Sequence, residues 1–257
     1  MFVLIVLAGF ASSAIAEVQN VRVTGDIRAR VNYSQNLTDL NDDVADSFGI
    51  VTQRTRVAVE SDLTDGVSAL VQLEAYSDWG ISGTALERDD ESFDVRLSQA
   101  YIKLEEMFMG PFDLKLGRQY LNYGRGFLIS SNEEEYKFDA IKLVGSMGDF
   151  TLDLFASQLA ETALIDTDSE LIGANLAYAL EDLVVEAYVF GITNKENDMD
   201  DEDPMYFGLR SDMSLIPALN VWGELAYESG TVGPTDLSGM AIDAGAEYVL
   251  EDMTWMP

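Results

Sequence analysis

Two pairs of arginines in the first part of the chain have a spacing of two residues. Arg28 and Arg30 are two residues apart, as are Arg54 and Arg56, and in an extended strand such neighbours point to the same face. Guanidinium groups bind carboxylates through two parallel hydrogen bonds, and rings of Arg and Lys favour anions in pores. The pattern predicts an anion-attracting surface whose candidate members are Arg22, Arg28, Arg30, Arg54, Arg56, Arg96 and Lys103.

Acidic residues on the same strands offer a second explanation for these cations. A hairpin folded about Thr64 is expected to bring Glu74 near Arg54 and Gln72 near Arg56, and the next turn to bring Asp113 near Lys103. Like charges on neighbouring strands are destabilising, whereas opposite charges stabilise the pair. Anion attraction and internal ion pairing therefore both remain open, and they are compatible with each other.

Composition removes several function classes. The 257 residues include no His and no Cys, so histidine-dependent hydrolysis, imidazole-bound zinc, thiolate metal sites and disulfides are excluded. The net charge of −31 argues against nucleic acid, because phosphate binding requires a basic surface. Thirteen of the fifteen Lys and Arg residues lie at or before Lys142, which leaves Lys195 and Arg210 beyond it. No cofactor or metal motif is present.

The N-terminus has the pattern of a secretory signal peptide. A short apolar run from Phe2 to Ala11 precedes Ala14-Ile15-Ala16, a small-x-small cleavage pattern. We predict a signal peptide over residues 1–16 and an exported domain over 17–257. After Ala16 no apolar run reaches the roughly 18 residues that a membrane helix requires, so any membrane crossing must use strands.

Apolar and polar residues alternate along most of the mature chain. From Arg22 to Tyr33, for example, small and apolar residues occupy one face and polar residues the other, which is typical of a strand with one apolar and one wet side. About twelve such stretches occur. They lie near residues 22–33, 50–62, 67–79, 97–104, 112–119, 138–143, 149–158, 170–180, 183–193, 205–214, 220–228 and 240–250.

The connectors between these stretches alternate in length. Long polar connectors are expected near 34–47, 80–92, 121–135, 159–169, 193–204 and 229–239, and short turns such as Thr64-Asp65-Gly66 lie between them. Long and short connections alternate in up-and-down outer-membrane barrels, and a soluble β-sandwich gives no reason for this alternation. The pattern predicts an all-β fold, a transmembrane antiparallel up-and-down β-barrel.

Three groups of motifs carry a family resemblance. The first is a strand ending in Gly117-Arg118-Gln119, a glycine loop at Tyr123-Gly124-Arg125-Gly126 and a return strand at Phe138-Asp139-Ala140. The others are Gln53-Arg54-Thr55-Arg56 and Ser98-Gln99-Ala100-Tyr101. In order and spacing, these motifs resemble the alginate-export family of outer-membrane β-barrel porins.

The resemblance implies a location and a larger barrel. The protein is expected in the outer membrane of a Gram-negative bacterium, in contact with lipid and lipopolysaccharide, with the visible strands forming part of a barrel of about eighteen. It implies passage of small anionic or carbohydrate solutes. Further candidate pore-lining residues are Glu74, Gln99, Tyr101, Gln119 and Lys142.

Two arginines are ambiguous. Arg118 shares the expected lipid face with Leu114 and Leu116, so either a bulge at Gly117 turns it into the lumen or it lies above the hydrocarbon. Arg125 is a candidate constriction residue if the glycine loop folds into the pore, and is otherwise a solvated loop residue. Both are included among the candidate pore-lining residues.

Three function classes remain. We expect a non-enzymatic channel. A glycan-acting enzyme with paired carboxylates is the first alternative, and Glu74, Asp78, Glu186 and Glu224 are its candidate acids. A secreted β-sandwich that binds carbohydrate is the second alternative.

Overall fold

The fold is seen in a computed structural model that describes residues 18–35, 48–79, 95–107, 110–131, 136–160, 168–195 and 203–249. The predicted signal peptide, residues 1–16, lies outside these ranges. Within them the chain is all-β, and no helix is long and apolar enough to cross a membrane.

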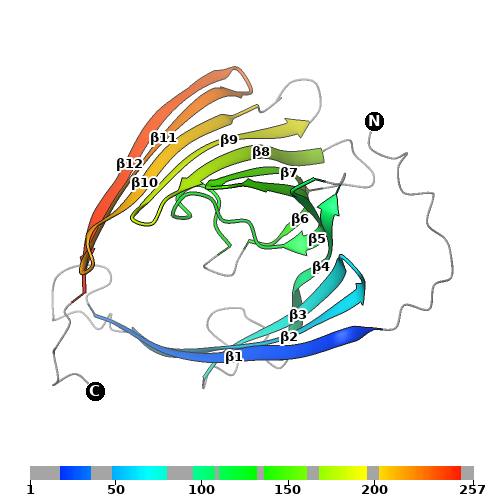
Figure 1. Cartoon of the computed structure of the whole chain (residues 1–257). Helices are drawn as coiled ribbons and strands as arrows, with labels where there is room; N and C mark the ends of the chain where they lie inside the picture. Colours follow the sequence, from blue (N-terminus) through cyan, green and yellow to red (C-terminus); the bar gives the residue numbers. More distant parts are fainter. Residues whose placement is uncertain are drawn as a thin grey trace.

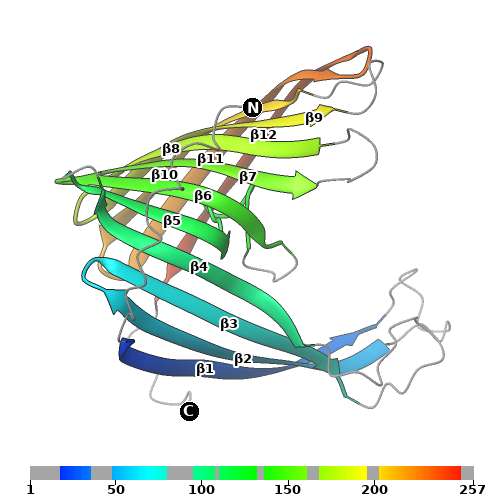
Figure 2. The same ribbon diagram turned by 90° about the vertical axis from the view of Figure 1, so that its right-hand side faces the viewer.

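In the described ranges twelve strands form one antiparallel sheet, in which each strand pairs with its neighbour in sequence (Figures 1 and 2). The predicted all-β, up-and-down topology is therefore confirmed. The strands are β1 Gln19–Ser34, β2 Phe48–Thr64, β3 Val67–Asp78, β4 Val95–Met107, β5 Phe112–Gln119, β6 Phe138–Met147, β7 Phe150–Ala160, β8 Asp168–Ala179, β9 Leu183–Lys195, β10 Met205–Ile216, β11 Leu219–Val232 and β12 Thr235–Tyr248.

The sheet curls into an open trough with a concave and a convex face (Figure 1). On the convex face large apolar side chains are exposed, among them Ile27 (74%) and Ile242 (68%). Most of the buried strand residues, including the polar Glu74, Gln119 and Glu224, lie on the concave face. Apolar-out and polar-in is the arrangement of membrane barrels, because lipid surrounds the sheet and water fills its interior.

One connector differs from the expectation. The region 229–239 was expected to be a long polar loop, but β11 and β12 continue through it and meet at Gly233-Pro234, with Val232 paired to Thr235. Gly233 has φ +55°, a left-handed conformation that glycine adopts without steric cost and that tight hairpins require. Polar composition alone did not distinguish this pair of strand ends from a loop.

β1 and β12 lie at the two ends of the strand order and do not pair with each other in the part of the chain that the structure describes. The twelve strands of the described residues therefore form a curved sheet that does not close into a barrel. A complete barrel of about eighteen strands remains a prediction.

Candidate functional site

The ladder register assigns the predicted pore-lining side chains to faces. Residues paired across strands share a face, and the pairs Asp26–Arg56, Arg56–Glu74 and Glu74–Arg96 connect β1 to β4 on the concave side. Followed across the sheet, the same register puts a large set of the predicted residues on the concave face. They are Arg22, Arg28, Arg30, Arg54, Arg56, Glu74, Arg96, Gln99, Tyr101, Lys103, Gln119 and Lys142.

Arg118 lies on the opposite face. It pairs with Ala100 on one side and Asp139 on the other, in an unbroken register through Gly117, so no bulge turns it inward. Its guanidinium binds the Asp139 carboxylate twice, at 2.9 and 2.7 Å. The next outward pair along the ladder is Leu116 with Ile141, whose side chain is exposed. The placement of Arg118 among the pore-lining residues is therefore wrong.

Asp26 organises the arginines of β1 and β2. Its carboxylate accepts from Arg54 Nη2 at 2.9 Å and from Arg56 Nε at 2.7 Å. Arg28 lies directly opposite Arg54 in the ladder. The Asp26 carboxylate on β1 thus holds two guanidinium groups of β2 in place, and the third arginine, Arg28, lies on β1 opposite one of them.

The hairpin between β2 and β3 is shifted from the expected register. Glu74 was expected near Arg54 and Gln72 near Arg56, but Glu74 pairs with Arg56 and Gln72 with Ala58. The reason is the turn, which is centred on Asp65-Gly66, with Gly66 at φ +70°. The buried Glu74 carboxylate forms an ion pair with Lys137, whose Nζ lies 2.8 Å from Glu74 Oε1. The expected contact between Lys103 and Asp113 is confirmed, at 2.8 Å.

Three lysines lie side by side on β4, β5 and β6. Lys103 pairs with Lys115, and Lys115 pairs with Lys142. The outer two have acid partners: Lys103 contacts Asp113, and Lys142 contacts Asp153 at 2.5 Å. Lys115 instead lies over the Tyr101 ring, 4.1 Å from its centroid, and forms no ion pair among the described residues. Alternation along 113–119 already places Lys115 on the polar face with Asp113 and Gln119, although Lys115 is not among the predicted pore-lining residues.

A segment after β5 folds back over the concave face. We call residues 120–131 the inner segment; it crosses the inside of the trough in Figure 1. Its Tyr123 amide donates to the Ile129 carbonyl at 3.2 Å, which closes the segment on itself. Gln119, fully buried, donates to the Ala140 carbonyl at 2.9 Å. The glycine loop therefore lies inside the sheet's curvature.

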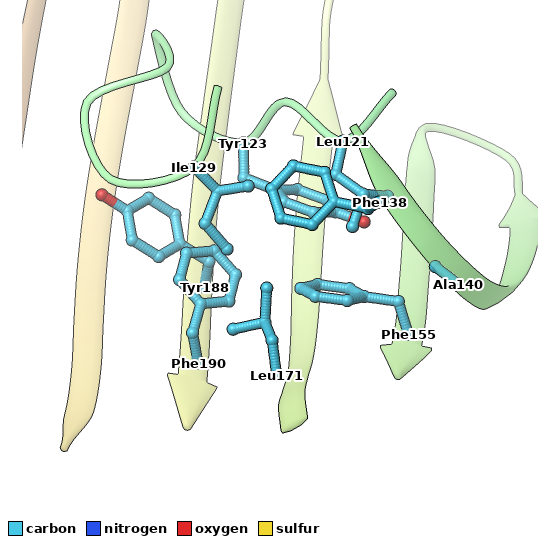
Figure 3. Close-up of a cluster of buried hydrophobic side chains, with 9 residues drawn as sticks. All are labelled: Leu121, Tyr123, Ile129, Phe138, Ala140, Phe155, Leu171, Tyr188 and Phe190. Carbon is cyan, nitrogen blue, oxygen red and sulfur yellow. The ribbon is translucent and has the colours of Figure 1, made fainter. Parts of the chain in front are cut away.

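An aromatic cluster holds the inner segment against β6 to β9 (Figure 3). Tyr123 stacks on Phe155 with ring centroids 4.9 Å apart, and Tyr188 stacks on Phe190 at 4.8 Å. Burial raises the pKa of the Tyr123 phenol well above its usual range, so the ring stays uncharged at any ordinary pH. The cluster comprises Leu121, Tyr123, Ile129, Phe138, Ala140, Phe155, Leu171, Tyr188 and Phe190.

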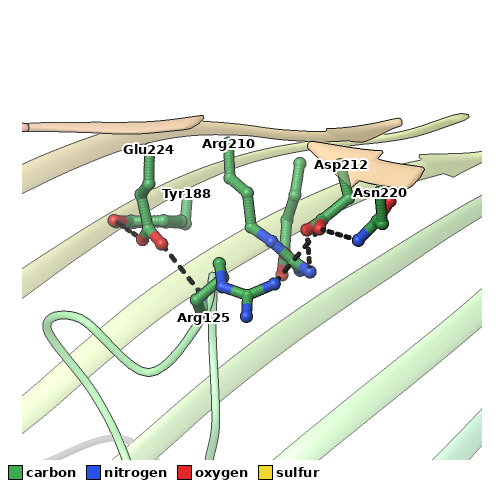
Figure 4. A network of polar contacts seen from close by, with 7 residues as sticks. Arg125, Tyr188, Arg210, Asp212, Asn220 and Glu224 are labelled. Atoms are coloured by element: carbon green, nitrogen blue, oxygen red, sulfur yellow. Dashed lines mark hydrogen bonds and ion pairs between the residues drawn. The ribbon is translucent and has the colours of Figure 1, made fainter. Parts of the chain in front are cut away.

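Arg125 anchors the tip of the inner segment to β10 and β11 (Figure 4). Its amide donates to Glu224 Oε2 at 2.9 Å, and its Nη1 to Asp212 Oδ1 at 3.1 Å. The guanidinium carbon lies 4.0 Å from the centroid of the Trp222 ring. Glu224 also accepts from the Tyr188 hydroxyl at 2.6 Å. Arg125 thus lies on the inner side of the curved sheet. The sequence had left open whether it lies inside the pore or in a solvated loop.

The candidate acids for glycan hydrolysis have structural partners. Glu74 binds Lys137, Glu186 binds Arg210 at 2.7 Å, and Glu224 binds Tyr188 and the Arg125 amide. Asp78 lies at the end of β3. Within the described ranges, no group of three or more acidic residues is arranged to hold a metal ion.

Comparison with known proteins agrees with this geometry. A family model described as alginate export matches residues 19–257, and no curated protein matches the chain. Among solved structures, OprB of Pseudomonas putida has a TM-score of 0.57 at 11% identity, over 88% of this chain and 70% of that one. A loop-deletion variant of Vibrio cholerae OmpT has a TM-score of 0.48 at 11% identity, over 89% and 88%.

The family match covers the whole described sheet, and the OprB likeness supports the barrel fold independently of it. The exposed apolar residues of the convex face provide the lipid-contacting surface that such a fold needs. The chain therefore belongs to the alginate export family and is a β-barrel protein of the Gram-negative outer membrane.

Proposed function

We propose that this barrel is a passive, non-enzymatic channel for small anionic solutes and carbohydrates, with an anion preference set by Lys and Arg on the concave face of β1 to β6. Support comes from the family, whose model is described as alginate export, and from the position of the cations. Contact with lipopolysaccharide at the convex face is part of the proposal.

The row of Lys103, Lys115 and Lys142 carries this proposal. Like charges directly opposite one another on neighbouring strands destabilise a sheet. Three adjacent lysines therefore suggest a functional role that offsets this cost. The outer lysines are compensated by acids, whereas Lys115 has lysines on both sides and an aromatic ring beneath it. No ion pair in the described structure compensates the positive charge of Lys115, so this charge is available to attract an anion that moves along the concave face.

Acidic side chains on β7 to β12 are expected to confine the anion path to β1 to β6. The concave face of β7 to β12 carries Asp153, Glu186, Asp212, Glu224, Glu228, Asp243 and Glu247. Arg210 binds both Glu186 and Asp212, and Arg125 binds Asp212. Anions are therefore expected to pass along β1 to β6, where the electrostatic potential favours them.

Neutralising Lys115 tests the proposal. In Lys115→Gln we expect the chloride-to-potassium permeability ratio to fall roughly sevenfold, because one charge at about 7 Å in water stabilises chloride and destabilises potassium by roughly 0.6 kcal/mol each. The measurement is the reversal potential of single channels in a planar bilayer under a KCl gradient.

The matched control is Arg118→Gln, which removes the same charge from the convex face. It should leave the reversal potential unchanged. If both variants shift the potential equally, the effect is one of overall charge and the lysine row does not set selectivity. A wild-type channel that prefers cations would contradict the proposed anion preference while leaving the channel itself in place.

A further inference from the structure

A polar hollow of about 340 Å³ lies on the concave face of β1 to β4, away from the lysine row. It is lined by side chains from four strands and by Tyr120 of the inner segment. Its volume is at the small end of the range of roughly 300–1,000 Å³ found for small-molecule sites. The lining residues are Thr24, Gly25, Asp26, Arg56, Ala58, Gln72, Gln99 and Tyr120.

The ladder explains why a hollow forms here. Thr24, Ala58, Gln72 and Gln99 occupy one continuous row across β1 to β4. The only methyl side chain in this row is that of Ala58, and long side chains surround it. The short side chain of Ala58 therefore forms the floor of the hollow, and the longer side chains of Gln72 and Gln99 form one of its sides.

The polar groups around this floor are held in place before any ligand arrives. Arg56 Nε donates to Asp26 Oδ2 at 2.7 Å, and Asp26 is further fixed by Arg54. Gln99 Nε2 donates to Gln72 Oε1 at 2.6 Å. Fixed hydrogen-bonding groups reduce the ordering that a ligand must impose on its site.

The chemistry of the lining favours a neutral polyhydroxy ligand. The Gln72 amide nitrogen and the Arg56 guanidinium supply donors, while the Gln99 amide oxygen and the Asp26 carboxylate supply acceptors. Among the lining residues the formal charges of Asp26 and Arg56 cancel, and Arg54, which also binds Asp26, lies outside the lining. A carboxylate or phosphate needs donors alone and would meet the Asp26 oxygens, whereas each sugar hydroxyl both donates and accepts.

Tyr120 adds the apolar surface that a sugar ring requires. It enters the hollow from the inner segment and is half-buried. An aromatic ring presents a flat apolar face, which suits the C–H face of a pyranose, while the Tyr120 hydroxyl itself is buried in the protein.

We propose that this hollow binds one neutral pyranose ring during its passage through the channel. The proposal rests on the proposed function, since the ring reaches the hollow from the lumen. It adds a site for neutral sugars at β1 to β4, on the same concave surface along which anions are expected to pass. Binding is weak, because a conducting site must also release its ligand.

The test is a titration of the open-channel current of the full chain in planar bilayers. D-Glucose is the neutral probe, and D-glucuronate, the same ring with a carboxylate, is the charged one. Glucose is expected to reduce the current along a saturating curve, at lower concentration than glucuronate does. A decrease that follows only solution viscosity, without saturation, would overturn the proposal, as would tighter binding of glucuronate.

Ala58→Leu fills the floor of the hollow and should abolish the saturable effect of glucose. Ala241→Leu is its matched control, because Ala241 is an exposed alanine on the concave face of β12 and gains the same volume. Gln99→Ala provides a second variant that leaves the floor open and removes an acceptor. Heat-modifiable migration on gels verifies that each variant folds. Equal glucose titrations in wild type, Ala58→Leu and Gln99→Ala would contradict the assignment.

Failure of the channel and failure of the site can be distinguished. If no conductance steps appear, the proposed function fails, and glucose binding is measured on detergent-solubilised protein by saturation-transfer NMR. Saturation transfer to glucose that is lost in Ala58→Leu and retained in Ala241→Leu would then support the site. No transfer in wild type would refute it.

Discussion

Replacing Gly124 by alanine is expected to release the inner segment from β11 and to raise the single-channel conductance. Gly124 has φ +62° and lies against the Glu224 carboxylate, so an added Cβ would overlap the carboxylate oxygens. Glu224 itself is held by the Tyr188 hydroxyl and the Arg125 amide and is 2% exposed. It has no open space into which it can withdraw.

Two physical terms add in this variant. A non-glycine residue in the left-handed region costs about 1–3 kcal/mol, and overpacking a filled site costs about 1–3 kcal/mol more. The docked segment should lose at least about 2 kcal/mol, which shifts the ratio of docked to released states roughly thirtyfold. Since the segment crosses the inside of the sheet, its release widens the path for ions.

Gly148→Ala is the matched control. It introduces the same left-handed backbone strain as Gly124→Ala but no overlap between the new Cβ and a neighbouring side chain. Gly148 has φ +60° and lies in the turn between β6 and β7, where an added Cβ meets nothing within 4 Å. It should keep the wild-type conductance. If Gly124→Ala also keeps wild-type conductance and open-channel noise, the inner segment does not restrict the channel.

Truncating Phe190 to alanine is expected to produce the largest loss of stability. Phe190 is 1% exposed and connects the two stacked pairs of the aromatic cluster: its ring centroid lies 4.8 Å from that of its own partner Tyr188 and 5.5 Å from that of Tyr123. A buried Phe→Ala change costs about 3–5 kcal/mol, because it removes buried apolar surface and leaves a cavity. The free energy of unfolding, measured by guanidinium titration in lipid vesicles, should fall by that amount.

Phe207→Ala on the neighbouring strand makes the same chemical change on the convex face. The Phe207 side chain is 44% exposed, so its truncation should cost only about 1–2 kcal/mol. Equal losses in the two variants would mean that the cluster adds nothing beyond ordinary apolar burial. A loss in Phe190→Ala with unchanged channel noise would mean that the cluster stabilises the sheet without positioning the inner segment.

The strands and their faces could be predicted because both depend on local sequence. Side chains alternate with period two in any strand, so the run from Arg22 to Tyr33 shows its wet and its lipid side before any partner is known. The same rule predicted the outward direction of Arg118, and the observed Arg118–Asp139 pair shows that it held through Gly117. Including Arg118 among lumen residues meant setting that rule aside in favour of a bulge.

Errors arose where composition or turn geometry had to be interpreted. The polar run at 229–239 contains strand ends and a two-residue turn, and polar residues are equally compatible with a loop and with the ends of a membrane strand. The hairpin register of Glu74 was off by two residues because the turn centre, Asp65-Gly66, had to be chosen among adjacent polar residues. A small displacement of a turn moves every cross-strand pair.

By itself, the sequence determined the all-β class, the antiparallel order and the two faces of the sheet, because these follow from periodicity and connector length along neighbouring residues. Only the tertiary structure decided that the glycine loop folds inward, since Arg125 meets Glu224 across 99 residues of chain. The hollow at Ala58 likewise needs four strands in register. Contacts of this kind depend on how the sheet curves, and no local pattern encodes that curvature.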